Sequence, residues 1–234
     1  MTEASALPIY VQTAETLIRD IAAGRLLDGE RLAPERQLAE DLGISVGTLR
    51  KALADLEDRG LLDRVQGSGN YVRAEKAADA GIYAMFRLER VEGGGLPTAD
   101  ILSVDRLAKP EGAPDFGPSK EGHRIRRLRR LSGRPAALEE IWLDGSWVAA
   151  ITRADLLESL YLYYRQTLGL VITRAEDRIT VGSMPGWATV DGLPAAGTPC
   201  GYIERVSTSS DGQPVEFSRT WYDAQSVRYV SRLK

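Results

Sequence analysis

The sequence lacks the features of a secreted or membrane-spanning protein. Its 234 residues contain one cysteine, Cys200, which cannot form an internal disulfide. No apolar run approaches the ~18 residues that suggest a membrane span, and the first residues do not show the charged-then-apolar pattern of a signal peptide. We therefore expect a soluble cytoplasmic protein that makes no contact with a membrane.

Histidine is as scarce as cysteine, which limits the possible chemistry. With His123 as the single histidine, there is no His/Cys cluster at metal-ligand spacing and no second histidine to complete a catalytic triad. We expect His123 at the surface, and we expect no catalytic residue, no metal and no cofactor. The four tryptophans are expected to pack in a core or an interface.

An excess of basic residues is also missing. The formal net charge is −3, and residues 1–75 carry 9 Lys and Arg against 13 Asp and Glu. Bulk charge therefore argues against a nucleic-acid-binding protein. However, Arg36, Arg50, Lys51 and Arg64 gather in or beside one motif, which predicts a locally basic face on an acidic domain. Such a protein would depend on dimerisation and specific contacts more than on general attraction to phosphates.

The chain has the size and the pattern of two domains. Its length and its 43% of hydrophobic residues are enough for two packed cores. Residues 74–81 contain Ala, Glu, Lys, Asp and Gly, lack apolar anchors and separate two patterned regions. We predict a first domain over residues 1–73, a linker over 74–81 and a second domain over 82–234.

The first domain opens with an amphipathic helix over residues 8–23, which Gly24 ends. Residues 25–32 are predicted as a short strand. Two short helices follow. The first covers residues 34–42 and has proline at its first position. The second opens at Ser45, whose hydroxyl can cap a free amide. Its buried stripe at i, i+3, i+4 and i+7 consists of Leu49, Ala52, Leu53 and Leu56.

The opposite side of the second helix is small, polar or cationic. Small residues allow a helix to approach a major groove closely, and Arg50 could reach guanine edges or phosphates. Predicted strands over residues 61–65 and 70–72, joined by a glycine-rich turn, then form a wing that could lie against the backbone or the minor groove. These elements predict a winged helix-turn-helix that binds DNA. The alternative is an interaction module of the same shape that does not bind DNA.

The motifs over residues 29–39, 45–53 and 61–72 resemble the DNA-binding domain of GntR-family bacterial transcription regulators. The resemblance and the outward side of the second helix together predict a set of DNA-facing residues. These are Arg36, Ser45, Val46, Gly47, Thr48, Arg50, Lys51, Gln66, Gly67 and Ser68. Val46 departs from the family, in which many members carry a base-reading arginine here, so this contact would be apolar or absent.

The second domain alternates strands, turns and short helices. Strands are predicted over residues 101–107, 123–131, 136–143, 171–181, 200–209 and 214–222. Helical turns are predicted over residues 86–92, 153–157 and 159–168. This pattern indicates the α+β class, with a mixed antiparallel sheet and helices packed on it.

The second domain resembles the UTRA effector-binding domain of the HutC-type GntR regulators, which has a chorismate-lyase-like fold. The resemblance lies in the segments over residues 127–139, 159–161 and 212–222. It implies that Arg127, Arg129 and Ser159 hold the anionic end of a ligand. It also implies that Glu139, Tyr161, Glu216 and Tyr222 surround its sugar end.

The spacing of the two arginines predicts an anion-binding site independently of the resemblance. Arg127 and Arg129 are two apart on one predicted strand, so both face the same side and could grip an anion with two forks. The alternative is a solvated cationic strand. The segment before Arg87 differs from the serine-containing loop of the sugar-phosphate sensors, so we keep a small polar anion as the ligand class.

The sequence thus predicts a metabolite-responsive transcription regulator and not an enzyme. Following the family, we expect a homodimeric repressor that a sugar phosphate or sugar acid releases from a palindromic operator in double-stranded DNA. An activator is one alternative. An enzyme acting on the ligand in the lyase-like domain is the other, although no poised nucleophile or acid/base pair stands out.

Overall fold

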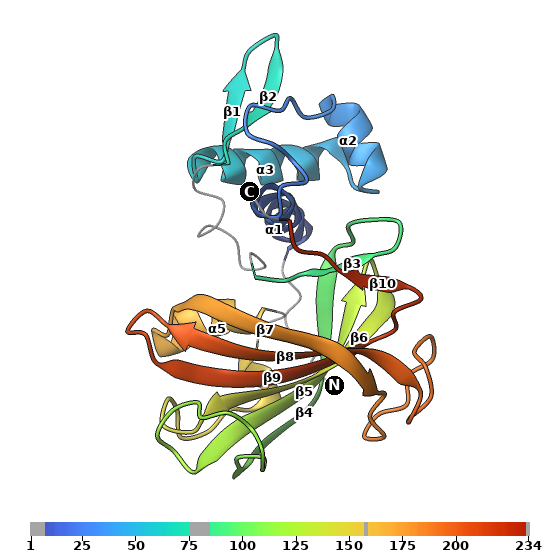
Figure 1. Cartoon of the computed structure of the whole chain (residues 1–234). Coiled ribbons are helices and arrows are strands. Elements are labelled where there is room, and N and C mark those ends of the chain that lie inside the picture. The colour runs from blue at the N-terminus through green and yellow to red at the C-terminus, as the bar shows by residue number, and fades with distance from the viewer. Residues whose placement is uncertain (1–7, 75–84, 157–158, 233–234) are drawn as a thin grey trace. The chain divides into compact units, whose positions relative to one another are not determined.

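A computed structural model describes residues 8–74, 85–156 and 159–232 of the chain (Figure 1). These residues divide into two compact units. One is formed by residues 89–228, and the other by the described residues before 89 together with 229–232. The predicted linker, residues 74–81, lies outside the described residues apart from Ala74. Within the described ranges, no helix is long and apolar enough to cross a membrane.

The first unit is a three-helix winged helix-turn-helix. It contains α1 (Ile9–Ala22), α2 (Glu35–Asp41) and α3 (Val46–Asp58), followed by the hairpin of β1 (Leu62–Val65) and β2 (Gly69–Val72). The Ser45 hydroxyl accepts a hydrogen bond from the Thr48 amide at 3.1 Å, so the predicted cap of α3 is confirmed. Gly43 and Gly60 end α2 and α3 in the left-handed region, at φ +66° and +69°.

The core of this unit is the predicted stripe of α3 packed on α1 and the wing. All four predicted α3 residues are fully buried, and they contact α1 and the start of β1. One prediction was wrong. Residues 25–32 form no strand, because a turn at Asp28 and Gly29 leaves a single bridge between Arg31 and Tyr71.

The second unit is built on one six-stranded antiparallel sheet in the order β4-β5-β6-β9-β8-β7. Its strands are β4 (Pro97–Ala108), β5 (Glu121–Leu131), β6 (Arg134–Asp144), β7 (Ile172–Ser183), β8 (Pro199–Ser209) and β9 (Pro214–Tyr222). β3 (Leu88–Arg90) pairs with β10 (Val227–Tyr229) in a separate two-stranded sheet. The α+β class and the strands predicted for the large sheet are confirmed.

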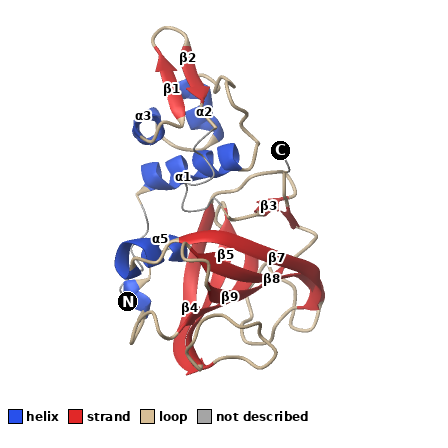
Figure 2. Cartoon of the chain, turned by 60° about the vertical axis from the view of Figure 1, so that its left-hand side comes forward, coloured by secondary structure: helices blue, strands red, loops and turns tan. Residues whose placement is uncertain are grey.

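Helical segments cover one face of the sheet (Figure 2). They are a 3₁₀ turn (Arg153–Asp155), α5 (Leu160–Tyr163) and a π-helical turn (Tyr164–Leu168). Leu160, Tyr163 and Tyr164 pack on Ile125 and Ile141 of the sheet. This covered face is called the helix face below. The opposite face is covered by loop residues, among them Phe116 and Trp187, which pack on Trp142, Phe217 and Trp221.

Two predictions for this unit were wrong. The segment expected as helical turns over residues 86–92 contains β3, because these residues bond to a later strand rather than to one another. His123, expected at the surface, is only 1% exposed. It lies opposite buried Leu143 in the sheet, and its Nε2 is 2.8 Å from the Val148 carbonyl oxygen.

The α3 stripe gives a direct test of the first core. We expect Leu53→Ala to cost about 2–5 kcal/mol, since the 0% exposed side chain would leave a cavity. The matched control Leu27→Ala, at a residue 61% exposed, should stay within about 0.5 kcal/mol of wild type. Native-state hydrogen exchange of the α3 amides measures both. Equal protection in the two variants would contradict the assigned core.

Candidate functional site

The predicted DNA-facing residues divide into exposed and partly buried ones. Arg36, Ser45, Gly47, Arg50, Lys51, Gln66 and Gly67 are exposed, whereas Val46, Thr48 and Ser68 are partly buried. Val46 packs in part against the core of the unit, and the Ser68 hydroxyl lies 2.7 Å from the Tyr71 hydroxyl. The outward position predicted for Val46 therefore holds only in part.

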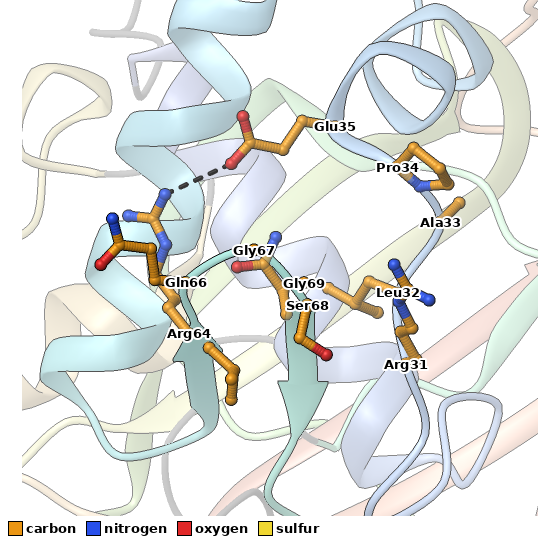
Figure 3. A pocket seen from close by; sticks show the side chains of 12 residues that line it. Arg31, Leu32, Ala33, Pro34, Glu35, Arg64, Gln66, Gly67, Ser68 and Gly69 are labelled. Atoms are coloured by element: carbon orange, nitrogen blue, oxygen red, sulfur yellow. Dashed lines mark hydrogen bonds and ion pairs between the residues drawn. The ribbon is translucent and has the colours of Figure 1, made fainter.

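A groove of about 370 Å³ lies between the start of α2 and the wing (Figure 3). Arg31 lies along one side of it, so close to the wing that a Cβ at Gly69 would come within 2.9 Å of its Nε. Glu35 and Arg64 lie on the other side, and Gly67 stands at the tip of the hairpin with φ +76°. Sequence reasoning did not assign Arg31 or Glu35 to this surface.

Glu35 joins the recognition helix to the wing. Its carboxylate accepts hydrogen bonds from Arg50 Nε of α3 at 2.6 Å and from Arg64 Nη2 of β1 at 3.3 Å. The hydrogen bond from Arg50 is the main reason why the pKa of Glu35 lies below its usual value. Its burial opposes this shift, and the charges of Arg50 and Arg64 add to it. The surface thus carries an ionised acid between two cations.

The second candidate site lies on the helix face of the sheet. In the register of β5 and β6, Arg127 lies opposite Glu139 and Arg129 lies opposite Ala137. Ala137 in turn lies opposite Tyr222 of β9. Directly opposite residues of an antiparallel sheet share a face, as do residues two apart on one strand. Arg127, Arg129, Glu139, Glu216 and Tyr222 therefore all lie on one face, as the period-two spacing predicted for the two arginines.

Both arginines bind the same carboxylate. Arg127 Nε donates to Glu139 Oε2 at 2.5 Å, while Arg129 donates to both oxygens, at 3.3 and 3.1 Å. All three residues are less than 7% exposed. Burial alone would raise the pKa of Glu139, but Arg127 and Arg129 outweigh it and lower the pKa to about 2. Burial and the nearby Arg129 also lower the pKa of Arg127.

A second buried cluster surrounds Glu216. Its carboxylate accepts hydrogen bonds from Tyr164 at 2.7 Å, Ser207 at 2.8 Å and Tyr161 at 3.2 Å. Burial raises the pKa of Glu216 and of both tyrosines. Next to this cluster, Arg205 donates to both oxygens of Asp177, at 2.5 and 2.7 Å.

The sequence missed four members of these clusters: Tyr164, Ser207, Arg205 and Asp177. A signal existed for three of them. Tyr164 follows Tyr161 at helical spacing, and Arg205 and Ser207 are two apart on a strand, as Arg127 and Arg129 are. Asp177 had no such signal, because its register opposite Arg205 depends on the sheet order.

Ser159 and Tyr222 have structural contacts of their own. The Ser159 hydroxyl caps α5 by accepting from the Leu162 amide at 3.3 Å. The Tyr222 ring lies across Gly201, where a Cβ would come within 2.2 Å of the ring. Glycine is therefore required beneath this ring. Among the described residues, no group of three or more His, Cys, Asp or Glu side chains could hold a metal ion.

Comparison with known proteins gives two family matches that together span most of the chain. Residues 9–72 match the family described as bacterial regulatory proteins, gntR family, and residues 93–228 match the UTRA domain. The chain is 59% identical over 228 residues to the HTH-type transcriptional regulator SmoD of Agrobacterium fabrum, covering 97% of both chains.

Two further similarities are more distant. The chain is 28% identical to the mannosyl-D-glycerate transport/metabolism system repressor MngR of Escherichia coli, covering 95% of each. The crystal structure of the possible transcriptional regulator YydK from Bacillus subtilis matches with a TM-score of 0.54 at 22% identity, covering 97% of this chain and 100% of that one. The structural match supports the fold alone.

The charge of Glu139 should appear as a pH dependence of stability. Because its folded pKa lies below the ordinary 4.5, the ionised carboxylate stabilises the fold above that pH and loses this effect as pH falls toward about 2. Between about pH 5 and about pH 3, the stability advantage of wild type over Glu139→Gln should shrink by about 2 kcal/mol.

Urea unfolding followed by tryptophan fluorescence measures this difference in the second unit, which contains all four tryptophans. A stability difference that stays constant over the same pH range would mean that Glu139 carries no charge between the arginines.

Proposed function

Because the chain belongs to the GntR family of bacterial transcription regulators and carries a UTRA domain, we propose that it is a repressor that a small polar anion releases from its operator. The observation that carries this proposal is the buried pair of guanidinium groups, Arg127 and Arg129, on the helix face of the sheet. The winged helix would bind the operator, and the UTRA domain would bind the anion.

The arginine pair supports an anionic ligand. Two guanidinium groups that already share the Glu139 carboxylate could bind a carboxylate or phosphate of similar shape. Arg127 and Arg129 carry two positive charges against the single negative charge of Glu139, so a ligand anion beside them would pair with the excess positive charge. A neutral ligand could not do this.

The Glu216 cluster supports a hydroxylated ligand. Glu216, Tyr161 and Ser207 offer a carboxylate and hydroxyls that can exchange their mutual hydrogen bonds for bonds to a sugar. The flat ring of Tyr222 on Gly201 offers an apolar surface of the kind that suits a pyranose. A ligand that combines an anionic group with several hydroxyl groups is a sugar phosphate or a sugar acid.

The name of one relative agrees with this class. MngR is named as a repressor for a mannosyl-D-glycerate system, and mannosyl-D-glycerate is a sugar derivative with a carboxylate. The relative shares 28% of its residues with this chain over nearly the full length. It supports the repressor role and the sugar-acid class.

The charge of the winged helix supports the proposal that a homodimer binds the operator. A single copy with net charge −4 over residues 1–75 gains little from general phosphate attraction. Two recognition helices on one palindromic site double the specific contacts. A ligand that binds better to a DNA-incompetent arrangement would shift the population by its differential affinity. The position of the footprint relative to the promoter would distinguish this repressor from an activator.

The recognition helix can be tested with one substitution. We expect Arg50→Ala to reduce operator affinity by more than about tenfold, because a fork that can bind a guanine edge or a phosphate is removed. Ligand binding should be unchanged. Arg178→Ala, at a side chain 73% exposed in the second unit, removes the same charge as a control. Fluorescence anisotropy with a labelled duplex measures both, and equal affinity in the two variants would contradict the assignment.

The anion site can be tested by thermal shift against sugar phosphates and sugar acids. We expect at least one compound to raise the melting temperature of wild type, since a ligand that binds the folded state stabilises it. Arg129→Gln should lose this response. Arg130→Gln is the control on the same strand, because Arg130 binds Asp100 at the surface. A full response in Arg129→Gln would place the anion elsewhere.

A further inference from the structure

An acidic residue lies among the cations of the candidate DNA surface, where it should weaken binding. Glu35 is the first residue of α2, and its side chain is 23% exposed. A carboxylate near a phosphate backbone opposes the attraction that lysines and arginines provide. Its presence beside Arg50 therefore needs a compensating role.

Stability does not supply that role. The Arg50 side chain is 64% exposed, and ion pairs as exposed as this contribute about 0–1 kcal/mol to folding. The first turn of α2 gains a little from an acid through the helix dipole, but many other residues could stand there. The specific feature of Glu35 is that its carboxylate holds two arginines from two other elements.

The contact with Arg50 uses one edge of the guanidinium group. Glu35 accepts from Nε, and no other hydrogen bond or ion pair of Arg50 occurs within the described part of the chain. A guanidinium group is planar and rigid, so fixing the Nε edge also fixes the direction of the two Nη donors. These donors are the pair that binds guanine O6 and N7 or a phosphate in two hydrogen bonds.

The contact with Arg64 connects Glu35 to the wing as well. Arg64 belongs to β1 and lies on the groove opposite Arg31, and its ion pair with Glu35 is the dashed line in Figure 3. One carboxylate therefore holds a cation of the recognition helix and a cation of the wing in a fixed relation. Arg64 also forms an ion pair with Glu57 of α3 at 3.7 Å, so the specific contribution of Glu35 is to link Arg64 to Arg50.

We propose that Glu35 is a positioning residue for operator recognition, which directs the Arg50 fork and couples it to Arg64 of the wing. It lowers general affinity for DNA and raises discrimination between sequences. Removing it should therefore change the two affinities in opposite directions, which a purely structural residue would not do. This inference rests on the proposed role of Arg50 as a DNA contact.

The test measures the ratio of two affinities. One probe is the tightest duplex that wild type selects from a random library, and the other is a scrambled duplex of the same length and composition. We expect Glu35→Ala to bind the scrambled duplex more tightly and the selected duplex more weakly. The ratio of the two affinities should fall about tenfold. A fork that is no longer held in direction loses part of the discrimination between bases that one bidentate contact provides.

Two matched variants separate positioning from charge and from folding. Glu40→Ala removes the same charge from the same helix, where Glu40 is exposed and outside the contact, so its ratio should stay within about twofold of wild type. Glu35→Gln keeps an acceptor for Arg50 Nε and should retain an intermediate ratio. It also provides the test if Glu35→Ala does not fold.

A double substitution tests whether the effect of Glu35 on the affinity ratio requires the Arg50 fork. In an Arg50→Lys background the fork is absent, so Glu35→Ala should no longer change the ratio. An undiminished effect there, or a ratio for Glu35→Ala equal to that of Glu40→Ala, would overturn the inference. If Arg50→Lys keeps the wild-type ratio, the assignment of Arg50 is wrong as well. If selection recovers no preferred duplex, the proposed operator fails together with the inference.

Discussion

The ion pairs of Glu139 with Arg127 and Arg129 are the interaction on which the second unit depends. They join the neighbouring strands β5 and β6 on the buried helix face, where removing one partner of a buried pair costs about 3–5 kcal/mol. Two arginines on one carboxylate leave one positive charge in excess at this depth. Under the proposed function, that excess charge favours an anion as the ligand.

The first unit contains the same set of three groups, one carboxylate and two guanidinium groups, but their exposure gives them a different role. Glu35 lies between Arg50 and Arg64 as Glu139 lies between Arg127 and Arg129. At the surface, water weakens the ion pairs, so Glu35 contributes geometry rather than stability. In the sheet, burial strengthens each pair. Under the two proposals, one arrangement of charges would direct cations in the first unit and bind an anion in the second.

Much of the fold could be predicted because local patterns decide it. Ser45 and Gly43 mark the ends of helices by their own chemistry, and the spacing of Arg127 and Arg129 determines their common face. Contacts between elements distant in sequence could not be predicted this way. His123 is buried because Leu143 lies opposite it, and Glu35 meets Arg50 across 15 residues. Nothing in the local sequence carries that information.

The proposed function requires the anion site and the DNA surface to be coupled, and coupling between two binding equilibria must be reciprocal. The most direct measurement is the affinity of wild type for the active compound, by calorimetry, with and without saturating selected duplex. We expect the duplex to weaken compound binding by the same factor by which the compound weakens duplex binding, at least about fivefold. Equal affinity for the compound in the presence and absence of duplex would contradict the proposed function.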